Sequence, residues 1–340
     1  MKYPIYLYNI FLPYMSKVLG IGNALVDILT RLESDEILNE FSLPRGSMQL
    51  VSLEVSNRLL TSTLGLEKKQ SSGGSAANTI HGLANLGIET GFVGKIGKDH
   101  LGNLFEEDLL KNNIRALIFY SLEETGRSIA LISKDSERTF ATYLGAAIDL
   151  HEEDITSDLL EGYDYLYMEG YLVQNHDLFS KALRLAKTHN LKVALDMASY
   201  NVVRDNKDFL YRSISDYVDI VLANEKEARF LTGKSPENAL TDIAGITDIA
   251  VVKLGYEGSL IKRKEEEHKI DIYKVHCIDT TGAGDLYAAG FLYGMCKDQP
   301  LDKCGQLGTL LGGKITEVIG AKLSEEQWKK VREEVKRICC

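Results

Sequence analysis

Short apolar runs alternate along the chain with longer segments in which apolar residues recur every three or four positions. Residues 163–172 and 191–198 have the composition of buried strands, and 178–190 between them has helical spacing. Residues 219–233 read as a strand leading into a helix, and 248–262 as two strands. This repeated alternation predicts an α/β fold with a mostly parallel sheet covered by helices.

The N-terminal half gives the same kind of pattern. Residues 17–28 predict a buried strand followed by a turn, and 72–88 a Gly-rich loop that enters a helix with Ser75 as N-cap. A strand follows near residue 90, then a helix over 101–114. The last 60 residues of the chain are largely helical in pattern.

Two segments differ in character from this framework. Residues 31–52 are more polar and carry a Pro-Arg-Gly turn, and residues 114–143 are β-rich with charged turns. We expect both to form a small β-sheet that serves as a lid, inserted into one domain over residues 15–340.

The first residues, 1–14, are apolar but are interrupted by Pro4, Asn9 and Pro13. They lack the basic start and small-residue cleavage site of a signal peptide, and they are too short to span a membrane. We expect a non-structural extension here, with Met15 as the natural start.

The composition narrows the classes of function. With 39 basic and 49 acidic residues the net charge is −10, which argues against a nucleic-acid partner. The five Cys residues form no C-x-x-C pair, so a reducing, cytoplasmic location without membrane contact is expected. The seven His residues show no metal-ligand spacing. A zinc enzyme is therefore not supported.

The stretch CIDTTGAGDLYAAGFLYG, residues 277–294, carries the candidate chemistry. Gly282 and Gly284 permit a tight turn, and the following small residues have helical spacing. The N–H groups at a helix start suit an anion such as phosphate. Asp285 in the first turn could accept a proton beside that anion, or could only stabilise the helix start.

Two other Gly-containing stretches fail the motifs that they resemble. GIGNAL, residues 20–25, has Leu25 where the dinucleotide fingerprint needs its third Gly. GKS, residues 233–235, has Ala228 where a P-loop needs Gly. Neither a Rossmann dehydrogenase nor a P-loop ATPase is supported.

The stretch DTTGAGDLYAAGFLYG closely resembles the C-terminal signature of the ribokinase-like carbohydrate kinases, the PfkB family. Residues 73–102 resemble the other signature of that family. NEKE at 224–227 resembles its N-x-x-E motif, and KLGYEGS at 253–259 its strand turn on the nucleotide side. The matches occur in family order and cover roughly residues 17–335.

The resemblance implies a three-layer α/β/α domain with a β-sheet lid and an ATP-dependent kinase that uses Mg²⁺. Asp285 would be the catalytic base, with the anion hole at Gly282, Ala283 and Gly284. The residues implied for substrate binding are Asn23, Asp27, Gly73, Gly74 and Asn78. Those implied for ATP are Asn224, Lys253, Gly255 and Gly258. Glu227 would hold Mg²⁺ through water, and Asp279 and Thr281 resemble positions that bind a monovalent cation such as K⁺.

Several of these positions have a purely structural alternative. Asp27 could cap the turn after the first strand, and Glu227 could be a solvated helix residue. Asn78 could be a polar residue on a helix face. Asp279 and Thr281 could only shape their turn.

The opening GNALVDI resembles that of adenosine kinases more than that of ribokinases, and 137–147 and 165–173 also resemble the nucleoside kinases. We therefore expect phosphorylation of a nucleoside 5′-hydroxyl, most simply that of adenosine. The alternatives are a sugar kinase for ribose, fructose or a keto-sugar acid, and a ligand-binding regulator without turnover. Arg138, beside the predicted lid, could contact phosphate or substrate, or could pair with Glu137 or Asp135. The chain could be a monomer, or a homodimer through the lid.

Overall fold

The fold is that of a computed structural model that describes residues 16–135 and 137–340. The predicted extension, residues 1–14, lies outside this range. Nine strands form a large sheet: β1 (Lys17–Ile21), β5 (Glu89–Gly97), β6 (Ile114–Ser121), β9 (Tyr165–Glu169), β10 (Lys192–Asp196), β11 (Ile220–Asn224), β12 (Ile249–Lys253), β13 (Ser259–Arg263) and β14 (Glu266–Ile270). Their spatial order is β14-β13-β12-β11-β10-β9-β1-β5-β6. The sheet is parallel from β6 to β12, and β13 and β14 add antiparallel strands at one edge.

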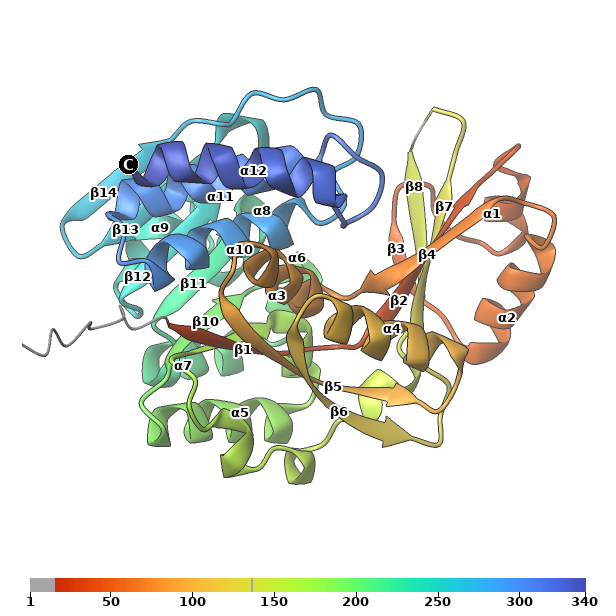
Figure 1. The fold of residues 1–340 in the computed structure, drawn as a ribbon, viewed down its shortest axis with the longest axis horizontal. Coiled ribbons are helices and arrows are strands. Elements are labelled where there is room, and N and C mark those ends of the chain that lie inside the picture. The colour runs from red at the N-terminus through yellow and green to blue at the C-terminus, as the bar shows by residue number, and fades with distance from the viewer. Residues whose placement is uncertain (1–15, 136) are drawn as a thin grey trace, which may run out of the picture.

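Helices cover both faces of this sheet, as the strand–helix alternation predicts (Figure 1). One face carries α3 (Ser75–Asn85), α4 (His100–Lys111), α10 (Ala283–Cys296), α11 (Leu301–Ile315) and α12 (Glu325–Cys339). The other carries α5 (His176–Thr188), α6 (Tyr200–Asp205), α7 (Lys207–Tyr217), α8 (Glu225–Thr232) and α9 (Pro236–Ala244). Short 3-10 helices are η1 (Gly145–Asp149), η2 (Glu152–Asp154), η3 (Ser157–Leu160), η4 (Gly170–Gln174) and η5 (Gly255–Glu257).

The fully buried strand β9 shows why the sheet needs both layers. Tyr165 and Tyr167 pack into the apolar cluster on one face, and Leu166 and Met168 into the cluster on the other. Successive side chains of a strand point to opposite faces, so a strand that is apolar throughout must be covered on both sides.

A second sheet of five strands stands beside the large sheet and forms the lid (Figure 1). Its strands are β2 (Leu25–Arg31), β3 (Met48–Leu50), β4 (Lys68–Gly73), β7 (Gly126–Ile132) and β8 (Arg138–Tyr143), in the order β3-β8-β7-β2-β4. Helices α1 (Glu36–Glu40) and α2 (Leu53–Ser62) cover its outer face, where Ile28, Ile129 and Leu131 are buried in one cluster with Leu38 and Leu59. Its other face is turned toward the large domain.

The strand predicted at 17–28 is two strands in two different sheets. A break at residues 22–24 separates β1, in the large sheet, from β2, the strand that pairs with both β4 and β7 in the lid. The apolar run continues across the break because both strands have buried faces, so hydrophobicity alone does not reveal the change of sheet.

Three other local predictions are corrected by the structure. Apart from Arg31 at the end of β2, residues 31–52 contain the helix α1 and only the three-residue strand β3, because Leu38 packs beneath the lid. Strand β6, inside the predicted lid segment 114–143, is an edge strand of the large sheet. Its residues, IRALIFYS, are β-rich like those of the lid strands, so composition does not distinguish the two locations. The N-cap of α3 is Gly74, and Ser75 is its first helical residue.

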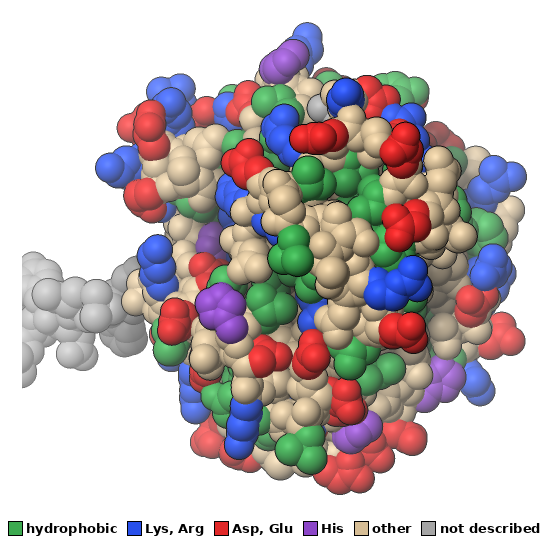
Figure 2. Space-filling model, turned by 90° about the vertical axis from the view of Figure 1, so that its right-hand side faces the viewer, with side chains coloured by type: hydrophobic (Ala, Val, Ile, Leu, Met, Phe, Trp, Pro, Cys, Tyr) green, Lys and Arg blue, Asp and Glu red, His purple; other side chains and the backbone are tan. Residues whose placement is uncertain are grey.

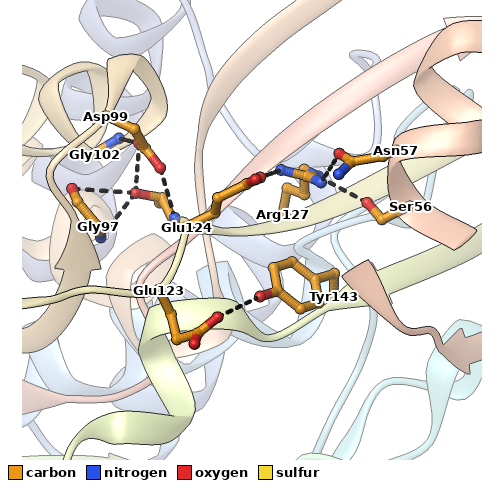
Figure 3. Close-up of polar contacts among 10 residues, drawn as sticks. Ser56, Asn57, Gly97, Asp99, Gly102, Glu123, Glu124, Arg127 and Tyr143 are labelled. Carbon is orange, nitrogen blue, oxygen red and sulfur yellow. Dashed lines mark hydrogen bonds and ion pairs between the residues drawn. The ribbon is translucent and has the colours of Figure 1, made fainter. Parts of the chain in front are cut away.

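The connection between β6 and β7 joins the large sheet to the lid through a dense polar network (Figure 3). The carboxylate of Asp99 accepts hydrogen bonds of 2.7 Å from both the backbone N–H and the hydroxyl of Thr125. Arg127, buried at the start of β7, donates to Ser56 Oγ at 2.7 Å, to Glu124 Oε2 at 2.7 Å and to Asn57 Oδ1. These contacts fix the start of the lid strand to α2 and to the connecting loop.

The surface on the lid side carries Lys and Arg side chains interspersed with Asp and Glu rather than one continuous basic area (Figure 2). Among the helices within residues 16–135 and 137–340, none is both long and apolar enough to cross a membrane.

Candidate active site

A cavity of about 2190 Å³ lies between the lid and the carboxyl ends of the parallel strands. This edge of an open α/β sheet is the usual ligand site. Most of the predicted site residues line the cavity: Asn23, Asp27, Gly74, Asn78, Asn224, Glu227, Lys253, Gly255, Gly258, Thr281, Gly282, Ala283, Gly284 and Asp285. Gly73, Arg138 and Asp279 do not line it, and each lies behind a residue that does.

The carboxylate of Asp285 is held from two sides by α3. Ser75 Oγ donates to Asp285 Oδ1 at 2.7 Å, and Asn78 Nδ2 donates to Oδ2 at 2.9 Å. Burial raises the pKa of Asp285 above its usual value, while these two hydrogen bonds act in the opposite direction. An oriented carboxylate with a raised pKa is suited to accept a proton.

The turn before Asp285 brings backbone N–H groups to the cavity. Gly282 is the N-cap of α10 with φ of 76°, and a Cβ there would lie 2.7 Å from the Ala321 Cβ, so only Gly fits. The N–H of Ala283 donates to the Thr280 carbonyl at 3.1 Å. The N–H groups of Gly284 and Asp285 point out of the first turn, where an α-helix supplies no intrahelical acceptor. An anion at this point would therefore be met first by Gly284 and Asp285.

A lysine lies directly over this helix start. The Lys253 Nζ would be 3.5 Å from a Cβ on Gly284, and it forms an ion pair of 2.7 Å with Asp196 at the end of β10. Burial lowers the pKa of Lys253, but Asp196 and Glu227 more than compensate, so the side chain stays positively charged. The helix N-terminus and the lysine together make a positively charged end of the cavity.

Asn224 and Glu227 form a capping box at the start of α8. Glu227 accepts from the Asn224 N–H at 2.7 Å and from its Nδ2 at 2.6 Å, while the Glu227 N–H donates to Asn224 Oδ1 at 2.9 Å. Burial raises the pKa of Glu227. Both carboxylate oxygens are already hydrogen-bonded, so contact with a metal through water fits this side chain better than direct ligation. The structural alternative of a solvated helix residue is wrong, because Glu227 is buried.

Asp27 projects from β2 into the lid end of the cavity. A Cβ on Gly73 would fall 2.4 Å from the Asp27 carboxyl, so the side chain lies flat against that glycine. The next residue, Gly74, has φ of 92° and a hypothetical Cβ 2.2 Å from the Asn23 carbonyl. The Gly73-Gly74 pair is thus required by close packing, and it leaves room for the Asp27 carboxylate.

Asn23 holds a buried glutamate that the sequence reading did not single out. Glu169, at the end of β9, accepts from the Asn23 N–H at 3.0 Å, from Asn23 Nδ2 at 2.7 Å and from the Ala76 N–H at 2.8 Å. Burial raises its pKa to about 7. Glu169 fixes the break between β1 and β2 to the start of α3, and the amide nitrogens of Asn23 point to Glu169 rather than to a ligand.

The predicted monovalent-cation residues meet a charged side chain of the protein itself. Asp279 Oδ1 accepts from the N–H and Oγ1 of Thr281 at 2.9 and 2.8 Å, and Oδ2 accepts from the Gly320 N–H at 2.6 Å. Arg138, from the lid strand β8, forms an ion pair with Asp279 and donates to Thr281 Oγ1 at 2.8 Å. A guanidinium thus takes the place of the expected cation, and these residues do not fit K⁺ in this arrangement. Arg138 therefore does not form the alternative ion pair with Glu137 or Asp135 that the sequence left open.

Asp196 and Glu169 are the two carboxylates that the sequence reading missed. Each is the last residue of a strand that is otherwise mostly apolar, in LKVALD and YLYME. The carboxyl ends of parallel strands meet at one edge of the sheet, and that rule could have marked both as candidates.

Comparisons with known proteins agree with this geometry. Residues 48–328 match the family described as pfkB family carbohydrate kinase. The 5-dehydro-2-deoxygluconokinase of Bacillus subtilis is 28% identical over 284 residues, which cover 79% of this chain and 86% of that protein.

Two solved structures share the fold at higher identity. The adenosine kinase of Sinorhizobium meliloti is 32% identical with a TM-score of 0.86, and the match covers 94% of this chain and 100% of that one. A probable sugar kinase from Rhizobium etli is 30% identical with a TM-score of 0.86, covering 94% of this chain and 98% of that one.

The family match spans most of the chain and includes the strands from β3 to β14, the start of α10 and Asp285, whereas β1, β2 and Asp27 lie before it. Membership implies a phosphotransferase that uses ATP and binds a sugar or nucleoside. The chain belongs to the PfkB family of carbohydrate kinases and has the ribokinase-like α/β fold.

Proposed function

We propose that this kinase phosphorylates the 5′-hydroxyl of a nucleoside, most simply adenosine, with residues 15–340 as one domain carrying the lid. The observation that carries this proposal is the apolar inner face of the lid. Met48, Leu50 and Phe140 line the cavity, and Met48 and Leu50 are 40% and 56% exposed. Exposed apolar side chains facing a cavity favour a flat apolar group such as a nucleobase.

The polar end of the same face suits a ribose. Asp27 lies two residues along β2 from Leu25, and both line the cavity. A carboxylate accepts hydrogen bonds from two neighbouring hydroxyls. In this arrangement a ribose contacts Asp27 at the floor of the lid, and the base extends beneath the apolar strands β3 and β8.

A sugar kinase is the second candidate, favoured by the resemblance to 5-dehydro-2-deoxygluconokinases. A keto-sugar acid would bring hydroxyls and a carboxylate under the lid. Among the described cavity-lining residues, neither the lid nor residues 144–178 supply a Lys or Arg. Because a buried carboxylate is stabilised best by an opposite charge, the lack of a Lys or Arg in this part of the lining favours a nucleoside over a sugar acid.

In the proposed reaction Asp285 accepts the hydroxyl proton as the substrate oxygen attacks the γ-phosphorus. The buried Oδ1 of Asn78 has no partner among the described residues, so it can accept a hydrogen bond from a substrate hydroxyl while Nδ2 donates to the Asp285 carboxylate. The N–H groups at the start of α10 and the Lys253 ammonium stabilise charge on the transferred group. The new bond joins the substrate oxygen to phosphorus, and the phosphorus–oxygen bond to ADP breaks.

The nucleotide end of the cavity has residues that fit ATP and Mg²⁺. Gly255 and Gly258 form the loop between β12 and β13 with φ of 57° and 89°, and a Cβ on Gly258 would overlap the Ile270 carbonyl oxygen. This loop brings the backbone of the two glycines and the exposed side chain of Tyr256 to the cavity rim. Mg²⁺ bound with ATP supplies charge neutralisation, and Glu227 would hold it through water.

The covered outer face of the lid supports a monomer. Helices α1 and α2 bury the side of the lid sheet that a second copy would need, and the other side faces the cavity. A dimer through the lid would have to use only the edge strands β3 and β4.

The test is ADP release with Mg-ATP and a panel of adenosine, other nucleosides, ribose, fructose and keto-sugar acids. We expect adenosine to drive turnover in the wild type. Asp285→Ala should lose roughly 10²–10⁴-fold in kcat while still binding adenosine. A free sugar as the best substrate would overturn the nucleoside proposal. Ligand-induced stabilisation without ADP release from any member would instead favour a non-catalytic regulator.

A further inference from the structure

A lysine that does not line the cavity lies behind the substrate end of the site. Lys322 is in the loop between α11 and α12, and its side chain is 17% exposed. Its ammonium forms an ion pair of 3.6 Å with Asp108 of α4. None of the family motifs in the sequence includes Lys322, and the mechanism above does not use it.

The contacts of Asp108 connect this lysine to Asp27, the carboxylate proposed to bind the substrate. Asp108 Oδ2 accepts from the hydroxyl of Ser72 on β4, the residue before Gly73. Gly73 is the glycine against which the Asp27 carboxylate lies. Successive residues of a strand face opposite sides, so the contacts of Ser72 place the ammonium on one side of β4 and those of Gly73 place the Asp27 carboxylate on the cavity side.

The charged groups around Lys322 are mostly carboxylates. The titratable groups around it are three carboxylates, Asp27, Asp108 and Asp285, together with His81 of α3. Burial lowers the pKa of His81 to about 3, so its ring is neutral and contributes no positive charge. Asp285 adds negative charge near Asp27. Lys322 is the cation that acts on Asp27 among these described groups.

We propose, on the basis of the nucleoside-kinase function above, that Lys322 is a positioning residue that keeps Asp27 ionised so that it accepts the substrate hydroxyls. Burial raises the pKa of Asp27 to about 7, with Lys322 lowering it and Asp285 raising it. The carboxylate therefore titrates near neutral pH even with the lysine present. Without the lysine a larger fraction would be protonated, and a protonated carboxyl accepts fewer hydrogen bonds.

The test compares Lys322→Met, Lys322→Arg and the double variant Lys322→Met/Asp108→Asn with the wild type. We expect Lys322→Met to raise the pH at which kcat/KM falls off by about one unit, a tenfold loss at acidic pH. The loss should appear mainly in KM, with kcat at alkaline pH changed less than about twofold. Lys322→Arg should restore most of the wild-type profile.

The double variant separates a charge effect on Asp27 from a packing effect through Asp108. If the lysine only neutralises Asp108, removing both charges restores the wild-type profile and overturns the proposal. If it acts on Asp27, the shift persists in the double variant. Lys95→Met is the matched control, because Lys95 forms a similarly shielded ion pair with Asp154 on the β5 side of the fold, at 2.8 Å.

A second readout does not need turnover. Carboxyl ¹³C NMR, with Asp27→Asn to assign the resonance, reports the titration of Asp27 directly. We expect its pKa to rise in Lys322→Met and in the double variant; an unchanged value would overturn the proposal even where kinetics change. A shifted Asp27 with an unchanged KM for the substrate would overturn the positioning role. If adenosine is not a substrate, the nucleoside proposal fails on its own, and the kinetic arm is run with the panel member that is turned over.

Discussion

The hydrogen bond from Ser75 to the base offers a quantitative test of the proposed proton transfer. Ser75→Ala removes the 2.7 Å donor to Asp285 Oδ1 and leaves the 2.9 Å donor from Asn78 in place. A hydrogen bond to a charged group contributes roughly 1.5–3 kcal/mol. One pKa unit corresponds to about 1.4 kcal/mol. Water entering the cavity offsets part of the loss, so we expect the pKa of Asp285 to rise further by about one unit.

The assay is the pH dependence of kcat for ADP release at saturating substrate, which reports the base in the enzyme–substrate complex, whereas the effect proposed for Asp27 appears in KM. In Ser75→Ala the acidic limb should move up by about one unit, with roughly tenfold lower activity below it and less than about twofold change above it. Thr79→Val is the matched control, because Thr79 donates at 3.0 Å to the backbone carbonyl of Asp285 and not to its carboxylate. A uniform loss at all pH values, or an equal shift in Thr79→Val, would refute the assignment of Asp285 as the titrating base.

Three other predictions concern the cation position, the lid and the buried acids. Because Arg138 takes the place of a cation beside Asp279, K⁺ should not raise the melting temperature of the wild type relative to an equal concentration of tetramethylammonium. It should raise the melting temperature of Arg138→Ala, and a K⁺ response of the wild type would contradict this prediction. Arg127→Met should lower the free energy of unfolding by about 2–4 kcal/mol in urea titrations, at the lower side of a fully buried pair because the Glu124 side chain is 47% exposed. Arg204→Met, at the exposed pair with Asp205, should leave the free energy of unfolding unchanged within error; equal effects of the two variants would show that the network in Figure 3 does not anchor the lid. The pKa values of Asp27 and Glu169 are raised to about 7, so the folded state prefers their protonated forms and loses stability as the pH rises through that value. When the pH is lowered from about 8 to about 6.5, the melting temperature should therefore rise while activity falls; below this window the neutral His81 opposes the gain. A fall of both the melting temperature and the activity would contradict the assignment.

Local chemistry was more predictable from the sequence than the location of the strands. The Gly282 turn, Asp285 and the Asn224–Glu227 pair each depend on a short motif whose backbone requirements are visible in the residue types. Glu169 and Asp196 stand alone at strand ends, so finding them required knowing which strands are neighbours. Likewise, Arg138, which pairs with Asp279, comes from the lid strand β8, about 140 residues earlier in the chain. No local sequence pattern encodes that contact.

The strand order of the lid was also beyond sequence patterns. Strand β2 looks like the continuation of β1, and β6 looks like a lid strand, because β-rich residues show that a strand forms but not which sheet it joins. The three residues of β3 are too few to show any period. The pairing of these strands, rather than their existence, was what the sequence left open.

The interleaved course of the chain through the lid has a consequence for folding. In β2, Asp27 is opposite Ser71 on one side and Ser128 on the other, so the lid sheet draws on both 25–73 and 126–143. Between these segments the chain returns to the large sheet and lays down α3, β5, α4 and β6. During synthesis β2 is therefore without its parallel neighbour β7 until β5 and β6 of the large sheet have been made. Such long-range pairing slows folding and leaves an unpaired strand edge meanwhile. A lid exchanged between relatives as one continuous block would lack β7 and β8; it would have to be transplanted in two pieces.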